Sequence, residues 1–376
     1  MIPLAVPNIA GNEAAYLQDC VDSTFVSTVG PYVTKFEQEV ASAAGTKYAV
    51  ATSSGTTALH MGLLAMGVGR DDVVILPSMT FIASANAISH CGASPWLIDV
   101  DQWSWTLCPQ VLLAELSQKA EIRSNGVFLK ACGRQVKAIL PVFNLGMAAD
   151  MDALRVVAEK WKLPLIVDAA AALGAEYKGK KSGACGALAS MYSFNGNKTV
   201  TAGGGGILAT DDEPLANMVR HLSTTARSGP DYDHDLVGYN HRMTNLQAAV
   251  GCAQMEQLAA FLQRKRQIRA FYDLAFAQTG LQAFPVPDWT HSADWYSGFL
   301  YPYTDVEGFR ARLREKGVDA RPFWKPVHLQ KPYQNAVRSD MLVCDQLWDR
   351  IITLPCSTNI TDSDLEQVVA VVLEAL

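Results

Sequence analysis

The stretch Ser193–Ala202 (SFNGNKTVTA) is followed by four glycines, Gly203–Gly206, and by the apolar run Ile207–Thr210 (ILAT). It places a single lysine, Lys198, between a predicted strand and a glycine run that cannot form a core by itself. Taken alone, the stretch is compatible with a tight glycine-rich turn that carries a solvated lysine. A Walker A phosphate loop is excluded because the order GxxxxGK[ST] is absent, and no GxGxxG segment opens a helix.

An aspartate upstream of this stretch favours a functional interpretation. Asp168 ends the apolar run Leu163–Val167, and ligands of open α/β sheets bind outside the carboxyl ends of the strands. An aspartate in such a place also commonly caps a helix. Together, however, Lys198 and Asp168 form the pair that a pyridoxal phosphate (PLP) enzyme requires. The lysine forms a Schiff base with the cofactor, and the carboxylate keeps the pyridine nitrogen protonated.

A small polar turn, Thr52–His60 (TSSGTTALH), connects a predicted strand to a predicted helix. Backbone N–H groups at a helix N-terminus, with hydroxyl groups beside them, form a suitable phosphate site. The same residues are also typical of ordinary helix capping. Ser193, just upstream of Lys198, could add a further hydroxyl group.

Short, continuously apolar runs alternate with helical patterns from about residue 35 to 250, which predicts an α/β fold with strands buried on both faces. The helical patterns include Thr56–Met66 and Met151–Lys160, the latter opened by Asp150, and the segment Asn125–Lys137 indicates a hairpin-like insertion. The predicted strands are Tyr48–Thr52, Val73–Pro77, Pro95–Asp99, Ala138–Val142, Leu163–Asp168, Ala189–Phe194 and Gly206–Thr210.

The alternation changes after a long amphipathic helix pattern at Asn245–Arg266. Beyond it we expect a strand at Trp295–Tyr303 and helices at Val306–Lys316 and Asp364–Leu376. The sequence therefore predicts a large α/β domain over residues 1–250, including the N-terminal segment, and a smaller α+β domain over residues 251–376.

The composition excludes several classes of function. The 31 Lys and Arg against 37 Asp and Glu give a net charge of −6 without blocks of like charge, which disfavours nucleic-acid binding. No apolar stretch approaches the roughly 20 residues of a membrane span. The eight cysteines include no CxxC pair and Met1–Leu4 lacks signal-peptide features, so a cytoplasmic location is expected, and no metal site is predicted. A charged fraction of only 18% favours an oligomer.

Five motifs occur in an order that resembles the DegT/DnrJ/EryC1/StrS family of PLP-dependent sugar aminotransferases, over essentially the whole chain. The opening segment Val6–Gly30, the insertion at 125–137 and the SFNGNK form are most similar to the members that aminate UDP-4-keto-6-deoxy-N-acetylhexosamines, as in legionaminic acid and bacillosamine pathways. The motifs are SSGTTALH (53–60), PSMTFIASANAI (77–88), IVDAAAALG (166–174), SFNGNK (193–198) with its glycines, and GYNHRMTNLQAAVG (238–251).

The resemblance implies a fold-type I aminotransferase with a mostly parallel seven-stranded sheet, flanking helices, a smaller C-terminal α+β domain and a homodimer with two shared active sites. By this resemblance Lys198 bonds to the cofactor and Asp168 binds its ring nitrogen. The other implied cofactor contacts are Gly55, Thr56, Thr57 and Ser193 around the phosphate, Phe81 stacked on the pyridine ring, and Asn240, which reaches the phosphate of the other subunit.

The family often binds the nucleotide sugar with residues at the positions of Arg227, Arg321, Trp324, Lys325 and His328. Cations suit a diphosphate and an aromatic surface suits a base or a sugar. Each of these residues also has a purely structural interpretation. The Arg and Lys side chains could be solvated charges, the tryptophan a half-buried ring and the histidine a hydrogen-bonded core residue. This sequence departs from the family at Ala171, where Glu, Gln or His is usual, so a polar partner near the cofactor or the sugar is missing.

The implied reaction moves an amino group from L-glutamate to the keto carbon, expected to be C4, of a nucleotide-linked 6-deoxy sugar. Two alternatives stay open. A PLP-dependent sugar dehydratase of the same family characteristically lacks the lysine, which is present here as Lys198. A non-catalytic homologue that only keeps the fold would be expected to lose Lys198 or Asp168, and the sequence has both.

Overall fold

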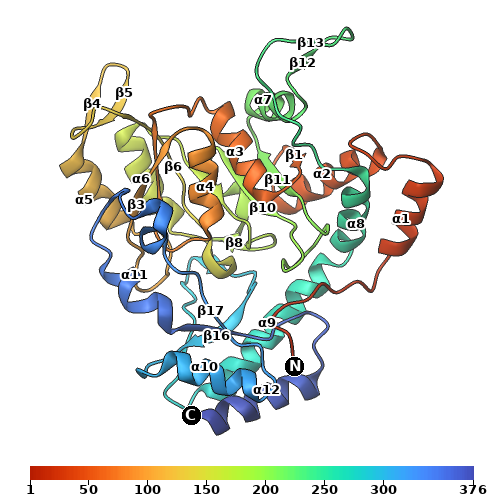
Figure 1. The fold of residues 1–376 in the computed structure, drawn as a ribbon, viewed down its shortest axis with the longest axis vertical. Helices are drawn as coiled ribbons and strands as arrows, with labels where there is room; N and C mark the ends of the chain where they lie inside the picture. Colours follow the sequence, from red (N-terminus) through yellow and green to blue (C-terminus); the bar gives the residue numbers. More distant parts are fainter.

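The computed structural model describes residues 1–376, and a seven-stranded sheet flanked by helices forms its centre (Figure 1). The strands are β1 (Tyr48–Thr52), β2 (Val73–Pro77), β3 (Ser94–Ile98), β6 (Gln135–Ile139), β7 (Ile166–Asp168), β10 (Ala189–Ser193) and β11 (Gly206–Thr210). All seven coincide or overlap with the predicted apolar runs.

The strand order is β1-β11-β10-β7-β6-β2-β3. The pairs β2/β3, β2/β6 and β7/β10 are parallel, and β11 runs antiparallel to both β1 and β10. Parallel bridges Ile139–Leu165 and Val142–Asp168 join β6 to β7 and make the sheet continuous. The mostly parallel seven-stranded sheet is therefore confirmed.

Both faces of the sheet are buried, which explains why its strands are apolar throughout rather than alternating. In β2, Val74 and Leu76 face one hydrophobic core, whereas Val73 and Ile75 face the other. The first core contains α3 (Gly55–Ala65), α4 (Ile82–His90) and α7 (Glu213–Ser223). The second contains α2 (Pro31–Ala44), α5 (Pro109–Lys119), α6 (Met151–Trp161) and α8 (Asn245–Met255).

Short strands add to the sheet next to β6 and beyond β3. The hairpin of β4 (Ala120–Arg123) and β5 (Gly126–Leu129) pairs with β6, so the predicted hairpin-like insertion is present. Beyond β3, the two-residue strand β18 (Val337–Arg338) adds in parallel. A separate small sheet contains β8 (Glu176–Tyr177), β9 (Lys180–Lys181) and β15 (Thr290–His291).

One predicted helix is divided in two. The prediction of a single helix over Asn245–Arg266 is wrong, because α8 ends at Met255 and α9 (Leu258–Phe276) begins after a break. At the break, Gln257 has φ −105° and ψ 0°. No glycine or proline marks this break. Instead, Glu256 accepts hydrogen bonds from Asn12, which directly precedes α1 (Glu13–Asp22), and from Tyr16 in its first turn. Contacts of this kind are tertiary and leave no local pattern.

The C-terminal part contains a four-stranded antiparallel sheet in the order β14-β16-β19-β17. Its expected strand is shorter than predicted, and both expected helices are present. The elements are β14 (Gln282–Ala283), β16 (Ser297–Leu300), β17 (Arg321–Pro322), β19 (Ile351–Leu354), α10 (Val306–Glu315), α11 (Leu342–Leu347) and α12 (Asp362–Ala375). The domain division at residue 250 stays a prediction.

A two-stranded arm projects from the body at the end of α7 (Figure 1). It consists of β12 (Arg227–Ser228) and β13 (Asp233–His234), and its tip carries the exposed Tyr232. None of the helices combines the length and the apolar character that a membrane crossing requires.

Candidate active site

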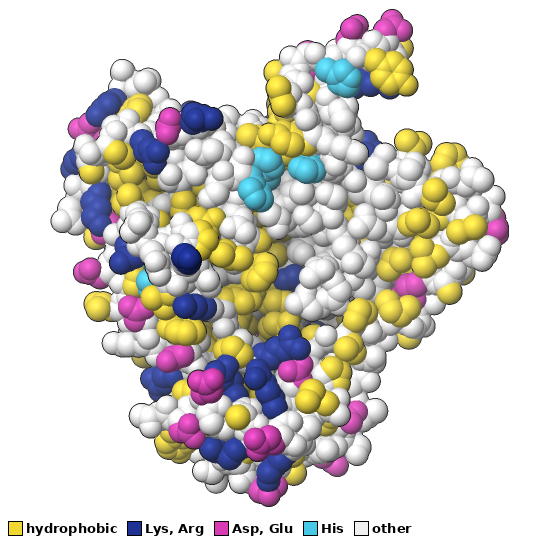
Figure 2. Space-filling view, viewed as in Figure 1, with side chains coloured by type: hydrophobic (Ala, Val, Ile, Leu, Met, Phe, Trp, Pro, Cys, Tyr) yellow, Lys and Arg dark blue, Asp and Glu magenta, His cyan; other side chains and the backbone are white.

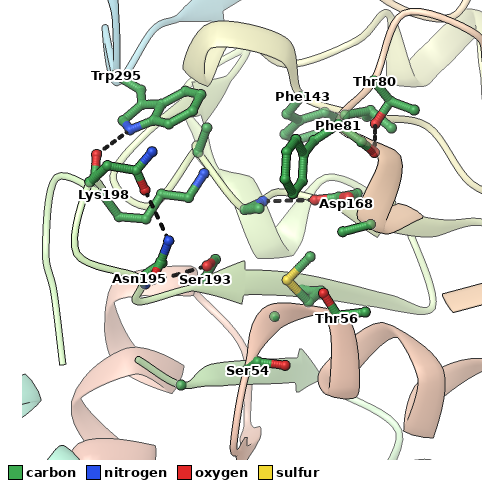
Figure 3. Close-up of a pocket in the computed structure, with 18 of the residues that line it drawn as sticks. Ser54, Thr56, Thr80, Phe81, Phe143, Asp168, Ser193, Asn195, Lys198 and Trp295 are labelled. Atoms are coloured by element: carbon green, nitrogen blue, oxygen red, sulfur yellow. Dashed lines mark hydrogen bonds between the residues drawn. The ribbon is translucent and has the colours of Figure 1, made fainter. Parts of the chain in front are cut away.

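A cavity of about 310 Å³ lies at the carboxyl ends of β7 and β10, beside the N-terminus of α3 (Figure 3). This is where ligands of open α/β sheets bind. The cavity brings together seven of the predicted site residues, namely Gly55, Thr56, Phe81, Asp168, Ser193, Lys198 and Trp324. Ala171, the residue that departs from the family pattern, also lines it.

Lys198 lies in the turn that follows β10, where its backbone N–H donates to the Asn195 carbonyl at 3.0 Å. Its Nζ lies inside the cavity, 3.7 Å from the centre of the Trp295 ring. Burial lowers the pKa of Lys198 from 10.5 to about 8, and the nearby charge of Asp168 opposes this shift. About a tenth of the amine is therefore uncharged at pH 7, far more than for an ordinary lysine.

Asp168 ends β7 and is buried at the wall of the cavity. Its Oδ2 accepts a hydrogen bond from Ser84 Oγ at 2.6 Å, and its Oδ1 accepts from the Ala170 N–H at 3.0 Å. Burial raises the pKa of Asp168, whereas these two hydrogen bonds and the charge of Lys198 act in the opposite direction. No cation forms an ion pair with this carboxylate at contact distance, so it can take a positively charged ligand atom.

The start of α3 forms another wall. Ser54 Oγ accepts from the Thr57 N–H at 3.1 Å, and Thr57 Oγ1 accepts from the Ser54 N–H at 2.9 Å, which is a reciprocal capping box. The helix begins close to β11, since a Cβ on Gly206 would lie 2.4 Å from the Ser54 carbonyl and the Gly55 nitrogen. The positive end of the helix dipole therefore reaches the cavity at Gly55 and Thr56.

Thr57 does not line the cavity, because its hydroxyl takes part in this helix cap. Its predicted phosphate contact stays a prediction. Phe81 is 53% exposed, and its ring lies 5.7 Å from the Trp324 ring, centre to centre, at an angle of 51°. Both rings line the same cavity.

Three other predicted residues lie elsewhere in the chain. Arg227 and Asn240 line a separate open cavity at the base of the arm. His328 is buried and bonded on both sides, with Nδ1 2.7 Å from Ser78 Oγ and Nε2 2.9 Å from Asp345 Oδ1. It does not reach the cavity, and this is the arrangement expected of a structural histidine.

The remaining two candidates, Arg321 and Lys325, are also outside the lining of the main cavity. Arg321 forms an ion pair with Asp319 at 2.8 Å, and both Arg321 and Lys325 are exposed.

Sequence reasoning did not find Trp295, Ser84, Phe143 or Asn197, although Trp295, Phe143 and Asn197 line the cavity and Ser84 holds Asp168. Trp295 lies just before β16 of the small C-terminal sheet, far from Lys198 in the chain, and no local signal marks it. Ser84 lies in the motif PSMTFIASANAI, so the spacing of that motif could have indicated it.

Comparisons with known proteins agree with this geometry. The model of the DegT/DnrJ/EryC1/StrS aminotransferase family matches residues 7–373. A GDP-perosamine synthase of Caulobacter vibrioides is 34% identical over 100% of this chain and 98% of its own length. EpsN of Bacillus subtilis, whose name describes a pyridoxal phosphate-dependent aminotransferase, is 34% identical over 99% of this chain and 95% of its own.

Among solved structures, DesV of S. venezuelae superimposes with a TM-score of 0.87 at 28% identity, over 96% of this chain and 94% of DesV. The family match spans nearly the entire sequence, and the fold and the cavity are those that its motifs imply. The chain belongs to the DegT/DnrJ/EryC1/StrS aminotransferase family.

Proposed function

We propose that this aminotransferase uses PLP to move an amino group from L-glutamate to the C4 keto carbon of a nucleotide-linked 6-deoxy sugar. The observation that carries the proposal is the pairing of Lys198 and Asp168 in one cavity, although thirty residues separate them in the chain. A volume of about 310 Å³ is within the range of small-ligand sites.

The residues of the cavity fit PLP at three points. The unpaired Asp168 carboxylate suits a protonated ring nitrogen, and the N-terminus of α3 at Gly55 and Thr56, with Ser193 next to it, suits a phosphate. Lys198 offers an amine with a pKa of about 8. When bound, PLP supplies an aldehyde that reacts with amines and a ring that accepts electrons from an adjacent carbon.

The chain's own groups then have defined tasks. Asp168 keeps the proton on the ring nitrogen, and Ser84 holds its carboxylate in place. With the cofactor bound, Lys198 Nζ would take the proton from the α-carbon of the amino donor and deliver it to C4′ of the cofactor, which requires an amine that is uncharged for part of the time. Trp295 and Phe143 line the cavity and keep water away from these atoms.

The sugar and its nucleotide are proposed from the resemblance and the relatives. The opening segment and the SFNGNK form favour a UDP-linked N-acetylhexosamine, whereas the GDP-perosamine synthase relative favours a GDP-linked sugar. Phe81 and Trp324 present an aromatic wall to either. Lys and Arg side chains gather below the apolar hollow in the middle of this face and suit a diphosphate (Figure 2).

A homodimer with shared sites accounts for Arg227 and Asn240. Both residues lie outside the cavity of their own chain and line an open polar cavity beside the arm. In our proposal this surface contributes to the site of a second copy. The dehydratase alternative is disfavoured because Lys198 is present and lies in the cavity.

The test is a stepwise reaction with the purified, PLP-loaded protein. Adding L-glutamate should bleach the near-visible absorption of the bound cofactor, and adding UDP-, GDP- and dTDP-linked ketosugars in turn should restore it with one sugar class only. Mass spectrometry of the product should show the amine in place of the ketone.

The Lys198→Ala variant is the matched control. The variant should still fold, because the lysine side chain that it lacks projects into the cavity. It should lose turnover by several orders of magnitude. Turnover comparable to the parent would contradict the role of Lys198. If glutamate bleaches the absorption but no ketosugar restores it, the proposed acceptor is wrong, whereas the assignment of glutamate as the donor still holds.

A further inference from the structure

Trp295 is the group that faces the free amine of Lys198. The Nζ lies 3.7 Å from the centre of the indole ring, and no carboxylate lies within ion-pair distance of it. Asp168 acts on it only at longer range. An ammonium group over an indole face is attracted by the ring quadrupole, most strongly where water is excluded.

The ring is tied to the segment that carries the lysine. Trp295 Nε1 donates to the carbonyl of Asn197, the residue before Lys198, at 2.7 Å. The indole stacks on Tyr296 at 3.9 Å between ring centres, and the Tyr296 hydroxyl accepts from Asn197 Nδ2 at 3.1 Å. The orientation of the ring relative to the lysine backbone is therefore fixed from two sides.

The backbone of Trp295 is also held on both sides. Its N–H donates to the Leu145 carbonyl at 3.1 Å, and its carbonyl accepts from the buried Lys265 Nζ at 2.8 Å. Leu145 and Asp294 both adopt left-handed conformations, with φ values of 59° and 46°. Such conformations are uncommon for residues other than glycine and persist where the surroundings impose them, often at functional sites.

We infer that Trp295 is a positioning residue whose indole face holds the Lys198 ammonium group inside the cavity whenever that lysine is not bonded to the cofactor. The inference rests on the proposed role of Lys198. In each turnover the lysine is displaced from the cofactor by the substrate amine and must bond to the cofactor again. A fixed position of the free amine keeps it near the reacting atom. Because the ring favours the charged amine, it counteracts the effect of burial.

The experiment measures the titration of Lys198 directly rather than the activity of the loaded enzyme. Apoprotein is mixed with PLP for a short time at a series of pH values and reduced with borohydride, and the labelled Lys198 peptide is quantified by mass spectrometry. The exposed Lys178 serves as the internal reference. The variants are Trp295→Leu, Trp295→Phe, which keeps an aromatic face, and Tyr296→Phe, which removes only the hydroxyl group.

In Trp295→Leu the midpoint of Lys198 labelling should fall by roughly one pH unit. In Trp295→Phe it should fall less, and in Tyr296→Phe it should stay at the parent value. Thermal unfolding verifies that each variant folds, and Trp295→Met replaces the leucine variant if that one does not.

Two results would overturn the inference, namely an unmoved midpoint in Trp295→Leu or equal shifts in the leucine and phenylalanine variants. Equal shifts would mean that the lost hydrogen bond to Asn197 matters and the ring face does not. If Lys198 is not labelled even in the parent protein, the proposed function fails instead.

Discussion

At the scale of single residues, burial shifts the pKa of each member of the Lys198 and Asp168 pair toward its neutral form. It lowers the pKa of Lys198 to about 8 and raises that of Asp168. Folding the apoprotein therefore places an ammonium group in an unfavourable environment. A bound cofactor with an anionic phosphate and a protonated ring nitrogen would compensate for these shifts.

This leads to a pH-dependent stability difference between the parent apoprotein and Lys198→Met. Below pH 8 the lysine is charged in both the folded and the unfolded state, so folding bears the full cost of its burial. The methionine variant should then be more stable by up to about 3 kcal/mol. Between pH 8 and 10.5 the folded lysine has lost its proton while the unfolded lysine still carries it, so the difference should fall steadily with pH. It should vanish above pH 10.5, where the lysine is uncharged in both states.

Urea unfolding of both apoproteins over a pH series measures this difference, with the exposed Lys47→Met as the control variant. The control should show no comparable pH dependence. An equal stability of parent and Lys198→Met at pH 7 would show that the amine is solvated in the apoprotein.

At the scale of elements, the sequence predicts the seven strands well because burial on both faces makes each of them a continuous apolar run. β2 and β11, for example, are buried at every position. Local patterns fail where tertiary contacts decide. The break between α8 and α9 depends on hydrogen bonds to Glu256, and Trp295 reaches Lys198 only through packing of the C-terminal sheet against the cavity.

The candidate site follows the same division. Asp168, Lys198, Gly55 and Thr56 were predictable because strand ends and helix starts position them, and all four line the cavity. The position of His328 outside the cavity was not predictable, because a sequence cannot distinguish a ligand-binding histidine from one that forms hydrogen bonds to Ser78 and Asp345.

The N-terminus of α3 offers a test that separates capping from cofactor binding. Thr57→Val removes the acceptor for the Ser54 N–H, so the apoprotein should lose about 1 kcal/mol of unfolding free energy. Thr56→Val, of the same shape, alters a hydroxyl that lines the cavity and takes no part in the cap. It should weaken PLP binding and leave the stability of the apoprotein unchanged.

Denaturant unfolding and equilibrium titration with PLP give both quantities for each variant. If Thr57→Val weakens PLP binding while the apoprotein keeps its full stability, the phosphate contact implied by the family resemblance is correct. The capping assignment would then be wrong.

At the scale of the whole molecule, the surface beside the arm has the chemistry of a ligand site but is separate from the cavity that holds the chain's own reacting groups. Arg227, Arg242 and Asn240 line this open polar cavity together with threonines. The exposed Tyr232 of the arm and the exposed Val29 of the N-terminal segment add apolar surface around it. In the proposed homodimer, a second copy of the chain would cover this surface, and Asn240 would contact the cofactor phosphate of that copy.

Mixing inactive subunits tests the shared site. In a heterodimer of Lys198→Ala and Asn240→Asp chains, one site carries both changes and the other carries neither, because a two-fold interface exchanges the same residues in both directions. Random mixing should therefore restore about a quarter of the parent activity. The control mixes Lys198→Ala with Asp168→Asn. Both of these positions lie in the cavity of one chain, so every site keeps one defect and no activity should return. Recovery in the control, or none in the first mixture although the subunits exchange and Asn240→Asp alone is impaired, would show that each chain completes its own site.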